Sequence, residues 1–191
     1  MTAPDAFSRA MRIAEAFEHA KIPYAVGGAI ALGIWGVPRG TVDVDVNVFV
    51  EPEELDRVID VLLTLGIVLD PARAKAEAAE RGMFVGDWDG MRIDAFTPSI
   101  EFSHEARRTR ARRTAAGVEA WYLSAEAVSV FKLLFFRSKD IADLERLVAV
   151  ADLDTAYVRG WMVEMMGEDD VRVAKWDEII RTYSSTGPTV R

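Results

Sequence analysis

Residues 24–50 read YAVGGAIALGIWGVPRGTVDVDVNVFV, and this stretch decides the fold. A short apolar run, Tyr24–Val26, stops at Gly27-Gly28, and an apolar segment then continues to Trp35. Between Thr41 and Val50 every even-numbered residue is valine. An alternation of period two predicts a strand with its valines buried on one face.

Two aspartates lie on the other face of this predicted strand. Asp43 and Asp45 are two positions apart, so both carboxylates point to the same side, about 7 Å apart along the strand. Aspartate is a poor strand former, and neighbouring like charges repel each other. The pair therefore has two interpretations: a solvated strand face, or a face that meets a cation.

The glycine pair upstream favours the second interpretation. A strand, a Gly-Gly turn and a helix together present bare backbone N–H groups and a helix N-terminus, which favour a phosphate. Gly27-Gly28 alone can mark nothing more than a tight turn. When the glycine pair is followed by Arg39-Gly40-Thr41 and then Asp43-Val44-Asp45, it is much more specific evidence for the second interpretation.

These residues resemble the nucleotidyltransferase superfamily of DNA polymerase β-like folds, in which a Gly-Gly or Gly-Ser turn precedes a strand bearing Asp-x-Asp. The closer likeness is to the AbiEii-like, minimal nucleotidyltransferase branch, where the turn reads GGxAL and the strand follows R-x-T. A second stretch, Lys132 followed by Arg137, Asp140 and Asp143-Leu144, resembles the C-terminal signature of that branch. The resemblance covers roughly residues 22–148.

The pattern along the chain predicts an α+β protein. Helices are expected over 5–20, 29–35, 52–65, 72–81, 125–136, 140–151, 154–166 and 169–183, and strands over 24–26, 41–50, 83–88, 91–96 and 117–123. Residues 98–116 are expected to be irregular or weakly helical. The resemblance implies a polymerase β-like core with a small mixed sheet flanked by helices. We expect this core over 1–123, a helical C-terminal lobe packed on it over 124–184, and a polar tail over 185–191.

A third acid lies in the hairpin predicted around Asp89-Gly90. Arg92, Asp94 and Phe96 share one face of its second strand. The resemblance implies that Asp94 is the third metal ligand, because the fold takes its third acid from a neighbouring strand. The alternative is that Asp94 only pairs with Arg92 or with an exposed arginine.

The resemblance also implies the chemistry: transfer of a nucleoside monophosphate from an NTP to an acceptor, with two Mg²⁺ ions. Asp43 and Asp45 would share the nucleotide-side metal, and Asp94 would complete the catalytic one. The N–H groups of Gly27-Gly28 would hold the distal phosphates. The remaining nucleotide-site residues that the resemblance implies are Arg39, Thr41, Lys132, Asp140 and Asp143.

Lys132 lies in the middle of a helix that is apolar nearly all round, so it must either extend to solvent or meet an anion. The resemblance assigns it the triphosphate, with Arg39 as a weaker candidate. Asp140 or Asp143 would orient this lysine or lie near the acceptor.

Charge and composition restrict the partners. The chain carries 23 basic and 31 acidic residues, a net charge of −8, so it would repel nucleic acid unless a local basic patch exists. Five arginines form such a cluster, which is either a site for an acidic acceptor such as RNA or a solvated surface: Arg107, Arg108, Arg110, Arg112 and Arg113. The absence of cysteine excludes disulfides, thiolate metal sites and a cysteine nucleophile. No secretion signal or membrane-spanning run is evident, so a cytoplasmic protein without membrane contact is expected.

Several acceptors fit the resemblance. The AbiEii-like branch suggests a toxin of a toxin–antitoxin pair that modifies tRNA ends and binds an antitoxin protein. The same fold also modifies aminoglycoside-type antibiotics and protein side chains, which suit the acidic pI somewhat better. A different class of answer is a non-catalytic relative that binds a nucleotide or a partner protein, although the intact acid triplet argues against it.

Overall fold

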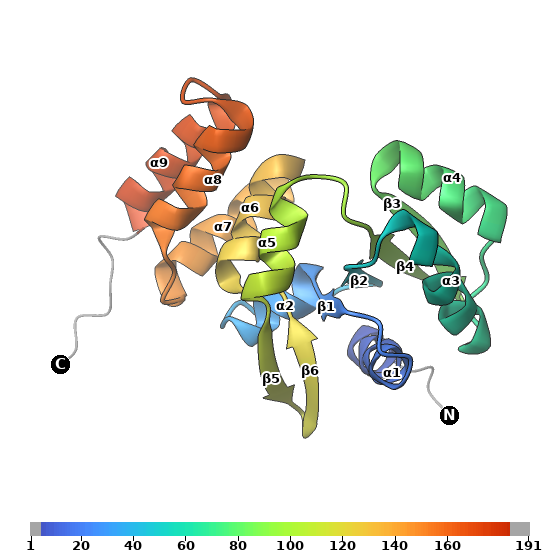
Figure 1. Cartoon of the computed structure of the whole chain (residues 1–191). Coiled ribbons are helices and arrows are strands. Elements are labelled where there is room, and N and C mark those ends of the chain that lie inside the picture. Colours follow the sequence, from blue (N-terminus) through green and yellow to red (C-terminus); the bar gives the residue numbers. More distant parts are fainter. Residues whose placement is uncertain (1–4, 184–191) are drawn as a thin grey trace. The chain divides into compact units, whose positions relative to one another are not determined.

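The computed structural model describes residues 5–183 (Figure 1). The contacts of these residues divide the chain into two compact units. The first comprises residues 5–30 and 40–123, and the second comprises residues 31–39 and 124–183. The segment 31–39 therefore groups with the helical residues that follow 123. The expected tail, 185–191, lies outside the described residues.

The described part of the first unit holds a six-stranded sheet in the order β3-β4-β2-β1-β6-β5. Its strands are β1 (Tyr24–Val26), β2 (Asp43–Val48), β3 (Met83–Trp88), β4 (Met91–Phe96), β5 (Ala111–Ala115) and β6 (Val118–Tyr122). Strand β2 runs parallel to β4 and antiparallel to β1, while β1 runs parallel to β6. The sheet is mixed and flanked by helices, which confirms the predicted α+β class.

Strand β2 confirms the valine alternation. Val44, Val46 and Val48 are buried, and Asp43 and Asp45 lie half-buried on the opposite face. The valines contribute apolar burial on one side, so a shift of register by one residue would bury the aspartates instead. The sequence pattern thus determines which face of the sheet carries the carboxylates.

The helices of the first unit are α1 (Ala6–His19), the 3-10 turn η1 (Pro52–Glu54), α3 (Leu55–Thr64), α4 (Pro71–Arg81) and α5 (Phe102–Thr109). Helix α1 begins where predicted, because Asp5 accepts a hydrogen bond from the backbone N–H of Ser8 at 2.7 Å. It packs against β1, β2 and β6, and α4 packs against β3 (Figure 1). The predicted β3–β4 hairpin is confirmed, with Asp89 and Gly90 both at positive φ in its turn.

The prediction for residues 98–116 was wrong in one respect. The region contains helix α5 and then strand β5, which pairs with β6 through a turn at Ala116-Gly117. Strand β5 is an edge strand whose three central residues are exposed: Arg112, Arg113 and Thr114. An edge strand with both faces wet needs no apolar alternation, so the sequence carried no period-two signal there.

The second unit is helical within the described residues. Its helices are α6 (Ala125–Phe135), α7 (Ser138–Val150), α8 (Thr155–Met166) and α9 (Val171–Tyr183), and α2 (Gly28–Ile34) begins in the first unit and ends in the second. Ser124 caps α6 by accepting from the N–H of Ala127 at 3.1 Å, as predicted. Helix α6 packs against α7 and α8 and is buried along most of its length. Between residues 5 and 183, no helix is both long and apolar enough to cross a membrane.

Candidate active site

The three predicted acids share one face of the first unit's sheet. In the parallel pairing of β2 with β4, Asp45 lies opposite Asp94 and Asp43 lies opposite Arg92. Residues paired across neighbouring strands point to the same side, and such strands are about 4.8 Å apart. Asp45 and Asp94 are therefore adjacent. Asp43 lies two residues before Asp45 on β2, on the same side of the sheet.

Arg92 covers Asp94. Its Nε donates to Oδ1 of Asp94 at 2.7 Å, and the Asp94 side chain is only 12% exposed while that of Arg92 is 57% exposed. The pairing that was considered as the alternative role for Asp94 is therefore present. In this arrangement the described residues 5–183 contain no group of three His, Cys, Asp or Glu side chains gathered to hold a metal ion.

The donor chemistry of this face nevertheless suits a hard cation. Carboxylate oxygens are the ligands that Mg²⁺ prefers, and each carboxylate has two oxygens, so one can bond an arginine while the other ligates. An arginine at 2.7 Å from Asp94 also offsets the repulsion between the adjacent acids. The residues present therefore fit a divalent ion, since Arg92 bonds Oδ1 of Asp94 and Oδ2 can act as a ligand.

Thr41 holds Asp43 at the entrance to β2. Its hydroxyl donates to the Asp43 carboxylate, and the backbone N–H of Asp43 lies 3.5 Å from the same hydroxyl oxygen. A short hydroxyl side chain two residues before an aspartate can fix the rotamer of that aspartate. This contact gives the Thr of the R-x-T motif a positioning role within the first unit.

The glycine turn packs against Asp45. The N–H of Gly27 donates to the backbone carbonyl of Asp45 at 2.9 Å, and a Cβ on Gly28 would lie 1.8 Å from Oδ2 of Asp45. The first contact uses the N–H of Gly27 to join β1 to β2, and the role of the Gly27-Gly28 turn toward phosphates stays a prediction. The second contact means that only glycine fits beside the Asp45 carboxylate.

Replacing Gly28 by alanine is therefore expected to displace Asp45. The position has φ +53, so alanine adds about 1–2 kcal/mol of backbone strain to the steric clash. We expect lower thermal stability and a loss of any activity that depends on Asp45. Gly160→Ala in α8 is the matched control, since its Cβ would meet nothing within 4 Å and alanine is a better helix former. A Gly28→Ala protein as active and as stable as the parent would contradict this role.

The second unit contains a buried cluster of charges around Lys132. Lys132 lies on α6 and its side chain is 7% exposed. Its Nζ donates to Oδ1 of Asp140 at 3.1 Å and to Oδ2 of Asp143 at 2.7 Å. Of the two alternatives for this lysine, contact with an anion is the one observed, and the anions are two carboxylates of the same chain.

Each of these carboxylates also binds an arginine. Arg39 Nε lies 3.2 Å from both oxygens of Asp143, and Arg137 Nε donates to Oδ2 of Asp140 at 2.6 Å. Burial by itself would raise the pKa of Asp140, but the hydrogen bonds and charges of Arg137 and Lys132 outweigh burial and hold this pKa below its ordinary value. The cluster therefore favours the ionised form of Asp140 inside the helical unit.

Two of the five clustered arginines are paired with acids. Arg108 binds Glu105 one helical turn before it, at 2.7 and 2.6 Å, and Arg112 on β5 binds Glu119 on β6 at 2.8 Å. Arg107 and Arg110 lie on and just after the last turn of α5, and Arg113 lies on β5. The cluster is thus divided between α5 and the β5–β6 hairpin, an arrangement that depends on the unpredicted strand β5.

Comparisons with known proteins bear on the fold. No protein-family model matches the sequence, and no curated protein matches it. A nucleotidyltransferase-like antigenic protein from Paracoccidioides brasiliensis has a similar structure, with 15% identity, a TM-score of 0.50, and coverage of 90% of this chain and 93% of that one. The antibiotic-resistance factor ANT(2'')-Ia is similar at 12% identity with a TM-score of 0.51, over 94% and 93% of the two chains. The chain therefore has a nucleotidyltransferase-like fold, and neither likeness singles out the AbiEii-like branch.

Proposed function

We propose that this protein is a divalent-metal-dependent nucleotidyltransferase that moves a nucleoside monophosphate from an NTP to an acceptor. The observation that carries the proposal is the register of β2 and β4, which sets Asp45 beside Asp94 on one face. On the same unit the Asp45 carboxylate is so close to Gly28 that no side chain fits there. A nucleotidyltransferase-like fold with carboxylates adjacent to a bare glycine turn suits a metal-bound triphosphate.

The chain's own residues have distinct roles in this proposal. Asp43, Asp45 and Asp94 would hold Mg²⁺, which when bound neutralises triphosphate charge and helps align the reacting groups. Thr41 orients Asp43, and Gly28 lets a phosphate approach the backbone beside Asp45. Arg92 balances the charge of Asp94 in the absence of a cation.

The charge cluster of the second unit brings three cations together. Lys132, Arg39 and Arg137 contact the carboxylates of Asp140 and Asp143. The roles of Lys132 and Arg39 toward the triphosphate stay predictions from the resemblance. Their contacts with Asp143 indicate that the three side chains act as one unit.

For the acceptor, RNA is the leading candidate because basic side chains gather on α5 and β5 of an otherwise acidic protein. The resemblance narrows this to tRNA ends, in a toxin opposed by a protein antitoxin. An aminoglycoside-type antibiotic is the second candidate, since ANT(2'')-Ia, an antibiotic-resistance factor, shares the fold.

The direct test offers every acceptor class at once. The protein is incubated with Mg²⁺ and each labelled NTP in turn, together with total RNA, an aminoglycoside mixture and a protein extract. We expect label in one acceptor class, and none when EDTA removes the metal. Label in RNA supports the leading candidate, and label in the antibiotics supports the second. The absence of transfer from all four NTPs, with Mg²⁺ or Mn²⁺, would count against the proposed activity.

A further inference from the structure

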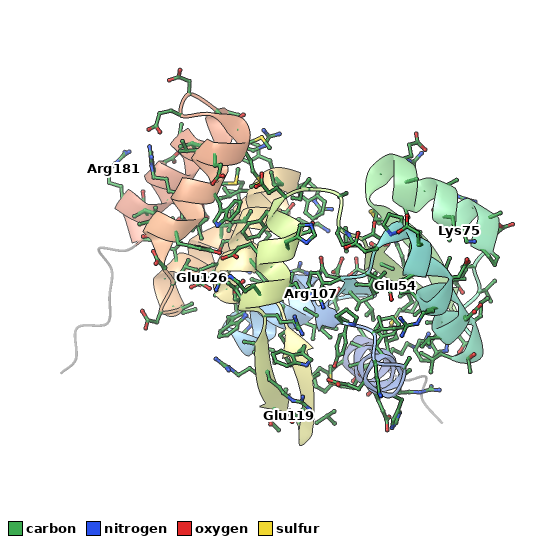
Figure 2. All side chains as sticks on the ribbon, in the orientation of Figure 1. Glu54, Lys75, Arg107, Glu119, Glu126 and Arg181 are labelled. Carbon is green, nitrogen blue, oxygen red and sulfur yellow. The ribbon has the colours of Figure 1, made fainter. Side chains whose placement is uncertain are left out.

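A basic pocket lies in the first unit beside α5 and β6. Its volume is about 430 Å³, and it is lined by His104, Arg107, Arg108, Arg110 and Trp121. No carboxylate is among these described lining residues. Figure 2 labels Arg107 beside the last turn of α5 and Glu119 toward the far end of the hairpin. The chain has a net charge of −8, so a cavity lined by three arginines differs in the sign of its charge from the protein as a whole.

Arg110 is held in place by aromatic rings. Its guanidinium carbon lies 4.5 Å from the centroid of Trp121 and 6.0 Å from that of Phe49. Its NH1 group donates to the carbonyl of Arg107 at 2.5 Å. Stacking and a backbone hydrogen bond fix the plane of the guanidinium, which reduces the entropy lost when it binds a ligand.

The charge of Arg110 is incompletely compensated. Its Nε atom is buried and has no hydrogen-bond partner within residues 5–183. Burial lowers the pKa of Arg110 and the nearby positive charge of Arg107 lowers it further, while the negative charge of Glu18 opposes them with a smaller effect. A buried donor without an acceptor and two adjacent like charges are both unfavourable, and an anion in the pocket would relieve both.

The arginines of the pocket that are not paired with an acid indicate what kind of anion it would bind. Arg108 is bound by Glu105, and the charge of Arg112, which lies 5.6 Å over Trp121, is shared with Glu119. Arg107 and Arg110 carry the pocket's remaining charge, because the effect of Glu18 on Arg110 is smaller than that of Arg107. His104 can add hydrogen bonds. Two guanidinium groups match a phosphate, which they bind through paired N–H donors.

We propose that this pocket binds a phosphate group, with Arg107 and Arg110 as its main ligands and Trp121 as the support of Arg110. The phosphate can belong to a nucleic-acid strand or to a small phosphorylated molecule, and a pocket of about 430 Å³ leaves room for the group attached to it. Its use as an anchor for the acceptor rests on the proposed nucleotidyl transfer. Phosphate binding itself needs neither metal nor NTP.

Binding is therefore measured on the full chain without metal or NTP. The probes are inorganic phosphate, pyrophosphate and a short single-stranded oligoribonucleotide. Calorimetry and tryptophan fluorescence measure the binding of each probe. We expect Arg107→Gln and Arg110→Gln each to weaken binding at least tenfold, and the fluorescence response to be lost in Trp121→Phe. Arg113→Gln, the same change on β5 outside the lining, should bind inorganic phosphate within twofold of the parent.

The outcomes separate the sources and the two proposals. Oligoribonucleotide binding that inorganic phosphate displaces, with a salt dependence that Arg107→Gln flattens, indicates nucleic acid. Equal affinity for pyrophosphate and the oligoribonucleotide indicates a small phosphorylated ligand. Failure of all three probes, or unchanged binding by Arg107→Gln, whose side chain is exposed, overturns the phosphate site. These results do not depend on whether transfer occurs, so failure here is distinct from failure of the proposed activity.

Discussion

Asp45→Asn is expected to abolish nucleotidyl transfer while leaving the protein folded. The substitution keeps the size of the side chain and removes the charge that would hold the metal beside Gly28. Loss of one preorganised electrostatic group of this kind costs more than about a hundredfold in rate. Because Asp45 lies opposite Asp94, the neutral side chain also removes a like-charge repulsion, so the free energy of unfolding should be unchanged or slightly higher. The rate of label transfer and urea unfolding are measured on the same preparation.

Asp60→Asn provides the matched control. Asp60 is an exposed aspartate on helix α3, away from the carboxylates of β2 and β4. Both the rate and the stability should stay close to those of the parent protein. Transfer by Asp45→Asn at the parent rate would exclude this face of the sheet as the reaction site. A variant that is inactive because it is unfolded would be recognised by its far-UV circular dichroism.

The candidate site could be predicted from sequence wherever local chemistry determines geometry. The valine alternation placed Asp43 and Asp45 together on the face of β2 opposite the valines, and Asp89-Gly90 fixed the hairpin that carries Asp94. Both signals depend on short-range rules, the two-residue period of a strand and the φ > 0 requirement of a tight turn. The side-by-side register of Asp45 and Asp94 is a tertiary outcome that their positions in sequence alone do not determine.

Contacts between distant segments could not be predicted in the same way. The N–H of Gly27 bonds the backbone carbonyl of Asp45, and Arg39 bonds Asp143 across a sequence separation of 104. Sequence left Lys132 two possibilities, extension of its charged end to solvent or contact with an anion. It did not show that two carboxylates of α7 supply it.

Lys132→Met is expected to destabilise the protein by about 3–5 kcal/mol, the usual cost of removing one partner from a buried ion pair. Methionine keeps most of the side-chain volume, so the loss reports on charge and hydrogen bonds more than on packing. Without Lys132, Asp140 and Asp143 remain 1% and 3% exposed with arginines as their remaining cations among the described contacts. Urea unfolding measures the difference, with Lys139→Met, an exposed neighbour, expected within about 0.5 kcal/mol of the parent.

The acid side of the stability curve gives this prediction a second, independent readout. In the folded protein the pKa of Asp140 lies below its ordinary value of 3.8, so the stabilisation it contributes is present above 3.8 and is lost as the pH falls through the lower folded value. Removing the charge of Lys132 raises this folded pKa. The variant should therefore lose stability at a higher pH than the parent does, and Lys139→Met should follow the parent. The contrary outcome is that Lys132→Met unfolds at the same acid pH midpoint as the parent and is equally stable at pH 7. Those results would show that the Lys132 charge does not stabilise the fold, and would leave ligand binding as its proposed role.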